Sequence, residues 1–292
     1  MTDVYAAVEA IVRIHDQQTS TVCEMLDVSR SAYYAWLMSE PSTHAARDAR
    51  LSPLVRDIFW KHRRRYGSRR IVAELAERGE PCGTRRVAKL LKTQGLSAIQ
   101  PKSFVPRTTD SRHRLGDRPN LLLDLPELTA IHPLWVGDIT DVPLAGGTFC
   151  YLATLMDRFS RRIVGWQLAE SMTEDLVIPV LHAGIRERQP PRSLIHHTDR
   201  GGQYASTRYR TILRRADIRQ SMSRADNCYD NAFMESGFGT LKTELEMTEY
   251  QHQPAARRDI GDYIAYYNLE RKHSALGYLS PHQFELRQPI RK

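Results

Sequence analysis

The sequence predicts an α/β protein in which a mixed β-sheet core, residues 131–288, follows all-α segments in residues 1–98. One observation is that strand-like apolar runs and helical patterns alternate from residue 134 onward, whereas residues 20–94 hold helical patterns alone. The other is size, because 292 residues with 41% hydrophobic content are enough for two or three domains with real cores.

Two pairs of helices are expected before the sheet. Residues 20–37 form a helix-turn-helix pattern in which Ser29 caps the second helix. Insertion of that helix into a DNA major groove and packing of its aromatic residues into a small core are equally good interpretations. The second pair consists of helices at 69–78 and 85–94, with Thr84 as the N-cap of the latter and Gly79 and Gly95 just past the two ends.

The chain divides into four expected parts. A helix-turn-helix-like segment, 1–45, precedes a basic helix-turn-helix DNA-binding domain, 46–98. A linker punctuated by proline, 99–130, leads to the sheet core and a C-terminal helical extension, 131–288.

The positive charge lies in the N-terminal part. Residues 1–120 hold 21 Lys or Arg and 13 Asp or Glu, whereas residues 121–292 hold 21 of each, so the first part accounts for the net +8. We expect a polyanion such as DNA to be held there, although a solvated basic face is the alternative interpretation. The candidate phosphate-binding side chains are Arg63, Arg64, Arg65, Arg69, Arg70, Arg85, Arg86 and Lys89.

The core region shows a specific order of elements. Three strands joined by short turns come first, at 134–144, 149–156 and 162–168. A helix that contains Pro179 follows at 173–188, and then a fourth strand at 193–197. A helix that begins near Ser206 and a last helix at 232–245 complete the order. Short connections make the first three strands antiparallel neighbours. This order is typical of the ribonuclease-H-like fold, in which the first strand lies beside the end of the fourth.

Three acidic residues occupy informative places in these elements. Asp138 interrupts the first apolar strand, Asp199 ends the fourth, and Glu235 lies in the last helix, with 35 residues between it and Asp199. Three such carboxylates can hold two Mg²⁺ ions about 3.5–4 Å apart for attack on a phosphodiester. Structural pairing of a buried acid is the alternative interpretation of Asp138.

Cysteine spacing and hydropathy argue against a zinc-finger protein, a secreted protein and a membrane protein. The four cysteines are far apart, which indicates reduced thiols and excludes the usual zinc-finger spacings. No signal peptide and no run of membrane-spanning length is found, so we expect a cytoplasmic protein without membrane contact.

Several stretches, in order, closely resemble the OrfB transposase of the insertion-sequence-three family. They are 66–69, 135–140 (Trp-Val-Gly-Asp-Ile-Thr), 151–161, 197–204 (His-Thr-Asp-Arg-Gly-Gly-Gln-Tyr), 227–232 (Asn-Cys-Tyr-Asp-Asn-Ala), 239–242 and 267–278. The resemblance covers nearly the full length and includes the spacing between Asp199 and Glu235.

The resemblance implies a catalytic core of the DDE transposase-integrase type. Asp138, Asp199 and Glu235 would be the metal ligands for two Mg²⁺ ions, with Mn²⁺ as a substitute, and Lys242 would contact DNA near the cleaved phosphate. Further candidates for DNA or active-site contacts, with core packing or capping as the alternative, are Tyr204, Asn227, Asn231, Asn268, Arg271 and His273. Asp141 and Gly237 depart from the family, which often has aromatic residues there.

The implied reaction is strand cleavage that frees a 3′ end, followed by strand transfer of that end. The partners would be the element ends and target DNA, further copies of this chain, and an OrfA product, fused or separate. The protein would work in the bacterial cytoplasm and on the nucleoid. A nuclease that only hydrolyses and a DNA-binding regulator with an inactive core are the alternative functions.

Overall fold

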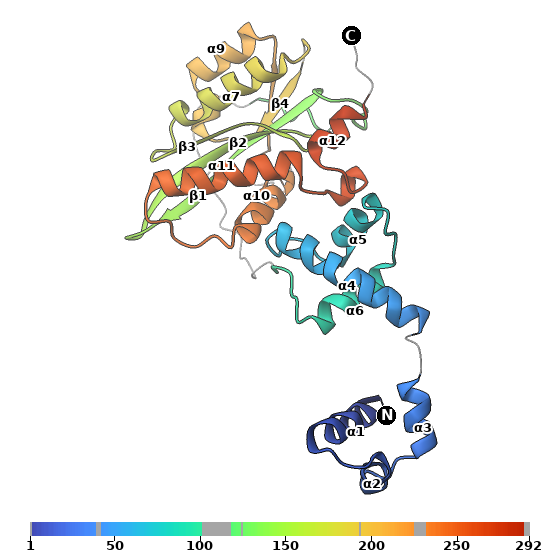
Figure 1. Ribbon diagram of the computed structural model, residues 1–292. Coiled ribbons are helices and arrows are strands. Elements are labelled where there is room, and N and C mark those ends of the chain that lie inside the picture. Colours follow the sequence, from blue (N-terminus) through green and yellow to red (C-terminus); the bar gives the residue numbers. More distant parts are fainter. Residues whose placement is uncertain are drawn as a thin grey trace.

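The computed structural model describes residues 2–38, 42–100, 118–123, 125–192, 194–224 and 232–288. Figure 1 shows a small N-terminal helical unit, a second helical unit, and a sheet covered by helices on both faces. Within the described residues no helix is long and apolar enough to cross a membrane. Cys23, Cys82 and Cys150 are free thiols.

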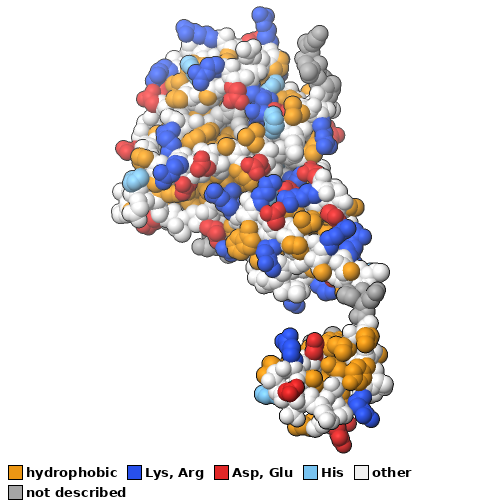
Figure 2. All heavy atoms as spheres, viewed as in Figure 1, with side chains coloured by type: hydrophobic (Ala, Val, Ile, Leu, Met, Phe, Trp, Pro, Cys, Tyr) orange, Lys and Arg blue, Asp and Glu red, His pale blue; other side chains and the backbone are white. Residues whose placement is uncertain are grey.

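The N-terminal unit consists of α1 (Thr2–His15), α2 (Thr19–Met25) and α3 (Arg30–Leu37). The predicted helix pair is confirmed, and the Ser29 side chain accepts from the backbone N–H of Ala32 at the start of α3. Helix α1 was not expected from the sequence. Tyr5, Tyr33 and Trp36 contact one another, as the packing interpretation expects. Figure 2 shows hydrophobic side chains gathered on the outside of this unit.

The second helical unit contains α4 (Thr43–Lys61), α5 (Ser68–Glu77) and α6 (Thr84–Thr93). Gly79 and Gly95 follow α5 and α6 with positive φ, as a helix end requires. The prediction that Thr84 caps α6 is wrong, because Gly83 has the extended cap conformation and Thr84 is already helical. The core of this unit depends on α4, a helix that was likewise not expected from the sequence.

The sheet has the strand order β3-β2-β1-β4-β5. β1 (Leu134–Leu144), β2 (Thr148–Asp157) and β3 (Ile163–Ala169) are antiparallel neighbours, whereas β4 (Ile195–Thr198) runs parallel to β1 and β5 (Arg219–Met222) parallel to β4. The mixed sheet confirms the ribonuclease-H-like fold and the four predicted strands. β5 was not expected.

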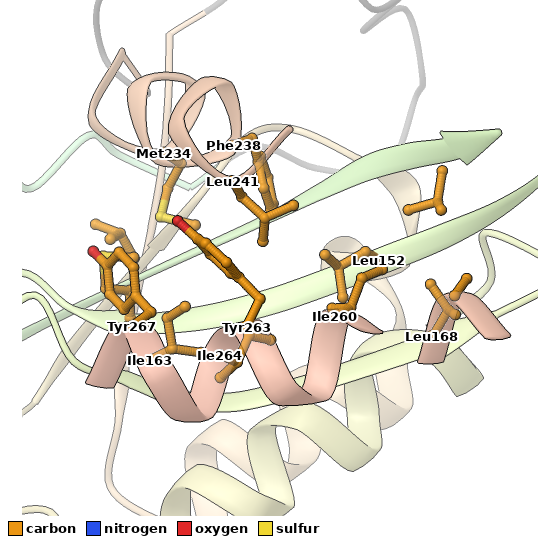
Figure 3. Packing of buried hydrophobic residues seen from close by; sticks show 14 of the residues in the cluster. Leu152, Ile163, Leu168, Met234, Phe238, Leu241, Ile260, Tyr263, Ile264 and Tyr267 are labelled. Carbon is orange, nitrogen blue, oxygen red and sulfur yellow. The ribbon is translucent and has the colours of Figure 1, made fainter. Parts of the chain in front are cut away.

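Two apolar clusters hold helices against opposite faces of the sheet. On one face, α10 (Ala232–Glu244) and α11 (Gln253–Leu269) cover β1 to β3, as Figure 3 shows for Phe238, Tyr263 and Leu152. On the other face lie α7 (Glu174–Arg188), α8 (Gly202–Ala205) and α9 (Thr207–Arg215). The short helix α12 (Pro281–Leu286) follows α11 and contacts it.

Close packing of α7 depends on glycine in the strand beneath it. A Cβ atom on Gly165 of β3 would lie 2.5 Å from the backbone oxygen of Val180, which leaves no room for any side chain. Pro179 is accommodated inside α7, so the predicted helix forms despite it.

Part of the expected linker belongs to the core structure. Leu121, Leu122, Leu125 and Leu128 pack against the cluster under α10 and α11. The connection between the helical unit and the sheet is therefore anchored before β1 begins.

Candidate active site

The two candidate aspartates, Asp138 and Asp199, lie side by side because β1 and β4 are neighbouring strands. Val136 of β1 pairs with His197 of β4 in the parallel ladder. Asp138 follows Val136 by two residues and Asp199 follows His197 by two residues, so the two aspartates lie beside each other on neighbouring parallel strands. Gly137 permits this approach, since a Cβ atom there would lie 2.9 Å from the His196 ring.

Local hydrogen bonds orient the two carboxylates. Asp138 Oδ1 accepts from the backbone N–H of Ile139 at 2.8 Å, and Asp199 Oδ1 accepts from that of Gly201 at 3.0 Å. Both side chains are half-buried. Short backbone contacts of this kind fix the direction of a carboxylate.

Tyr204 lies close to both aspartates. Burial raises the pKa of its hydroxyl well above the ordinary value, and the negative charges of Asp199 and Asp138 raise it further. Its ring also contacts His196 and Tyr209. The protonated Tyr204 is therefore part of the wall behind the two carboxylates.

The two adjacent histidines of β4 support the site from opposite sides. His196 Nε2 lies 2.7 Å from the Tyr209 hydroxyl, and burial lowers the pKa of His196 to about 3, so the ring is neutral. His197 is held between the hydroxyls of Ser221 and Ser223, at 2.8 and 3.2 Å. The contacts of both rings thus hold the end of β4 in place, directly before Asp199.

Glu235 lies in the first turn of α10, which packs on β1. On either side of it, the Arg158 guanidinium lies 4.0 Å over the Phe233 ring, and Gly237 faces Met156 of β2. The Glu235 side chain is exposed. In the described part of the chain no three His, Cys, Asp or Glu side chains are grouped as a metal-binding set. The structure thus brings Asp138 and Asp199 together, and places Glu235 on the helix over the same strand.

The Glu235 helix has the predicted buried stripe. Met234, Phe238 and Leu241 are buried, and Leu245 packs beside them. Lys242 is half-buried and its ammonium lies 3.1 Å from the Asp141 carboxylate of β1. The glycines of α10 are not required by packing, since Gly239 has nothing within 4 Å of a Cβ position.

The basic candidates of the helical unit fall into two groups. Arg63, Arg69 and Arg85 are exposed, and within the described residues none has an acidic partner. Arg86 and Lys89 of α6 both pair with Asp48 of α4 at 3.2 Å. Arg64 lies 3.8 Å from Glu246. These six side chains lie at the surface or near it.

Arg65 and partly exposed Arg70 instead make hydrogen bonds within the protein. Arg65 is buried, its Nε donates to the backbone oxygen of Glu244 at 3.1 Å, and its guanidinium lies over the Tyr266 ring. Arg70 Nε donates to the backbone oxygen of Lys272 at 3.0 Å. Both arginines join the helical unit to the core.

Three of the remaining candidates have structural partners. The Asn268 side chain exchanges two hydrogen bonds with the backbone of Ile163, at 3.0 and 2.9 Å. Arg271 donates twice to Glu244, and buried His273 lies next to Arg271. These contacts support the packing interpretation. Asn227 and Asn231 lie outside the described residues.

Glu244, the buried acid that Arg271 and Tyr263 contact, is a residue that the sequence pattern did not single out. A signal was present, because Glu244 lies three residues after Leu241, on the edge of the apolar stripe of α10. An acid in that place needs a buried partner.

Family models match two parts of the chain. An integrase core domain matches residues 130–228, a second model of the same description matches 216–281, and an HTH-like domain matches 46–104.

Curated relatives match over most of their length. A 31 kDa protein of insertion element IS600 from Shigella sonnei is 41% identical, covering 90% of this chain and 97% of the relative. The transposase of IS904 from Lactococcus lactis is 38% identical over 84% and 97% of the two chains. Transposase InsF of IS3A from Escherichia coli is 36% identical over 90% and 92%.

Solved structures resemble the chain more distantly. A simian T-cell lymphotropic virus intasome, in complex with a PP2A regulatory subunit, gives a TM-score of 0.48 at 20% identity, over 76% of this chain and 72% of the other. The HTLV-2 integrase catalytic core in complex with magnesium gives 0.40 at 15% identity, over 54% and 97%.

Proposed function

The chain belongs to the IS3 family of transposases, a DNA-binding enzyme with an integrase core, and from this premise we propose that Asp138, Asp199 and Glu235 perform its chemistry. The observation that carries the proposal is the parallel pairing of β1 with β4, which brings Asp138 beside Asp199. Glu235 enters from α10, the helix that packs on β1.

The donor set fits a hard divalent cation. Asp138, Asp199 and Glu235 offer carboxylate oxygens, which Mg²⁺ prefers over nitrogen or sulfur ligands, and Mn²⁺ accepts the same set. Neutral His196 lies behind β4 with its ring bound to Tyr209, so it stays out of the donor set. Two bound Mg²⁺ ions would stabilise charge on the attacking and leaving oxygens.

The residues of the chain would orient the reaction. The backbone N–H groups of Ile139 and Gly201 fix the two aspartates in direction, so that little rearrangement is needed when a phosphodiester enters. Water would first release a 3′-hydroxyl at the element end, and that hydroxyl would then attack a second phosphodiester. No covalent link between the enzyme and DNA is required.

DNA would be held by the surface-facing basic residues of the helical unit and by Lys242. The proposed contacts are Arg63, Arg64, Arg69, Arg85, Arg86, Lys89 and Lys242, and Arg65 and Arg70 are left out because they bind within the protein. Transfer of two element ends requires at least two copies of the chain on DNA. An OrfA product, fused or separate, would be a further partner, and action would take place on the nucleoid.

The test is formation of joined element ends in cells that carry the native locus on a plasmid. We expect junction DNA from the wild type and a loss of at least about 100-fold in Glu235→Gln, because the carboxylate charge is needed for metal binding. Glu249→Gln, an exposed acid beyond α10, is the control and keeps wild-type yield. Equal yields from Glu235→Gln and the wild type would remove Glu235 from the mechanism.

A further inference from the structure

The helical unit is joined to the core by a buried set of polar contacts. The Tyr66 hydroxyl donates to the backbone oxygen of Glu270 at 3.2 Å and accepts from the backbone N–H of Lys272 at 2.8 Å. Tyr66 has no exposed surface, and its ring stacks on His62 with 3.8 Å between centroids. A hydroxyl with both hydrogen bonds made in a buried place fixes the two segments relative to each other.

The same segments are linked by charged side chains. Arg70 donates to the backbone oxygen of Lys272, and the ammonium of Lys272, which is almost fully buried, pairs with Glu77 of α5. His62 lies 3.1 Å from the Tyr266 hydroxyl of α11. The helical unit therefore contacts both α11 and the segment that follows it.

Glu244, the last residue of α10, is the centre of this junction. Its carboxylate accepts from Arg271 at 2.8 and 2.6 Å and from the Tyr263 hydroxyl at 3.1 Å, and Arg70 lies 3.6 Å away. Bidentate binding of this kind is both strong and directional. The end of α10 is thus held by α11, by the segment after α11 and by the helical unit.

The junction fixes the DNA-binding helices relative to the catalytic helix. α10 carries Glu235 and Lys242 as well as Glu244, whereas the helical unit carries the exposed basic side chains, among them Arg85 and Lys89 of α6. Without such contacts, two units on a generic flexible tether of about 18 residues would be separated by roughly 23 Å root-mean-square. That range spans about seven base pairs at 3.4 Å each, so many phosphates would reach the site.

We propose that the junction of Tyr66, Arg70, Glu244, Arg271 and Lys272 sets the distance along DNA between the segment bound by the helical unit and the phosphate that is cleaved. These residues act as positioning residues, and the proposal rests on the transposase function above. It assigns the two arginines to spacing and not to DNA contact.

The experiment maps the joined element ends by sequencing. Tyr66→Phe removes the two hydroxyl contacts and keeps the stacked ring, and Glu244→Gln removes the charge that Arg271 binds. Glu285→Gln is the matched control, because the Glu285 side chain of α12 is 9% exposed against 7% for Glu244 and is bound by two nitrogens of Arg188 and by Arg162, neither of which belongs to the junction. Thermal melting and DNA affinity are measured on each protein.

We expect one dominant junction sequence from the wild type and from Glu285→Gln. Tyr66→Phe and Glu244→Gln should bind DNA as the wild type does and give junctions spread over several neighbouring positions. A single wild-type junction from folded Tyr66→Phe, or an equal spread from Glu285→Gln, would overturn the proposal. Should Glu244→Gln fail to fold, Tyr66→Phe decides alone. Absence of junctions from the wild type would contradict the transposase function instead.

Discussion

The ammonium of Lys242 on α10 lies 3.1 Å from the carboxylate of Asp141 on β1, and the two side chains are only partly shielded from water. The pair joins the helix of Glu235 to the strand of Asp138. Lys242 is the residue that the resemblance assigns to DNA, and Asp141 stands where related proteins often have an aromatic residue. With Lys242 as a proposed phosphate contact, Asp141 would compete with a phosphate for its ammonium.

Asp141→Asn is expected to raise DNA affinity by releasing Lys242. One additional phosphate contact should steepen the dependence of log K on log salt by roughly one unit. Folding stability should change by less than about 1 kcal/mol, because partly exposed pairs contribute little. Equilibrium binding across a salt series measures both effects.

The background of Lys242→Ala provides the control for this prediction. Lys242→Ala alone should weaken binding, and adding Asp141→Asn to it should change nothing further. An equal gain from Asp141→Asn with and without Lys242 would mean that the aspartate repels DNA directly.

A second prediction concerns DNA binding by the outer face of α6. Arg85, Lys89 and Lys92 are spaced by four and three residues, so they share one exposed stripe. Arg85→Ala should lower the salt slope by about one unit and weaken binding to all sequences alike. Lys89→Ala should do less, since Asp48 already neutralises part of its charge.

Arg50→Ala is the matched control for the α6 stripe. Arg50 is an exposed arginine of the same unit that pairs with Glu80. Binding that falls equally in Arg50→Ala and Arg85→Ala would indicate a general effect of net charge, and would remove the stripe as a contact surface.

The sequence predicts elements well where the signals are local. β1 was predicted with its observed bounds, because an apolar run is closed by the glycine turn at Gly146 and Gly147. β5 was missed since its residues, Arg-Gln-Ser-Met, show no apolar run. The segment forms a strand because it pairs with the open edge of β4, and this pairing depends on residues outside the segment.

The candidate site likewise has residues that the sequence placed correctly and residues whose contacts it did not reveal. The order of strands was enough to place Asp138 beside Asp199, and the structure pairs their strands as expected. The roles of Arg65 and Arg70 could not be read from a run of basic residues, since the partner Glu244 is 179 positions from Arg65. Nothing local distinguishes a buried arginine from its exposed neighbours Arg63 and Arg69.

Two glycines are expected to respond to alanine with opposite signs. Gly165→Ala should destabilise the fold by about 1–3 kcal/mol, because the new methyl group would meet the backbone of α7 and force a shift. Gly239→Ala should stabilise by up to about 1 kcal/mol, since alanine favours the helix and meets open space. Urea unfolding of both variants beside the wild type measures the two differences. An unchanged or more stable Gly165→Ala would contradict the packing described for β3, and a less stable Gly239→Ala would contradict the open space at α10.

The last prediction concerns acid and His273. Burial, together with the positive charges of Arg271, Arg70 and Arg161, lowers the pKa of His273 to about 2, whereas the unfolded value is about 6.5. Below about pH 6.5 the unfolded chain binds a proton at this residue and the folded chain does not, so the free energy of unfolding falls as pH falls. This loss amounts to about 1.4 kcal/mol per pH unit and continues toward pH 2. His273→Asn lacks the proton site, so its unfolding free energy should depend on pH less steeply by that amount. Urea unfolding at several values between roughly pH 6 and pH 4 tests this, and equal slopes in the two proteins would show that His273 takes up its proton in the folded state as well.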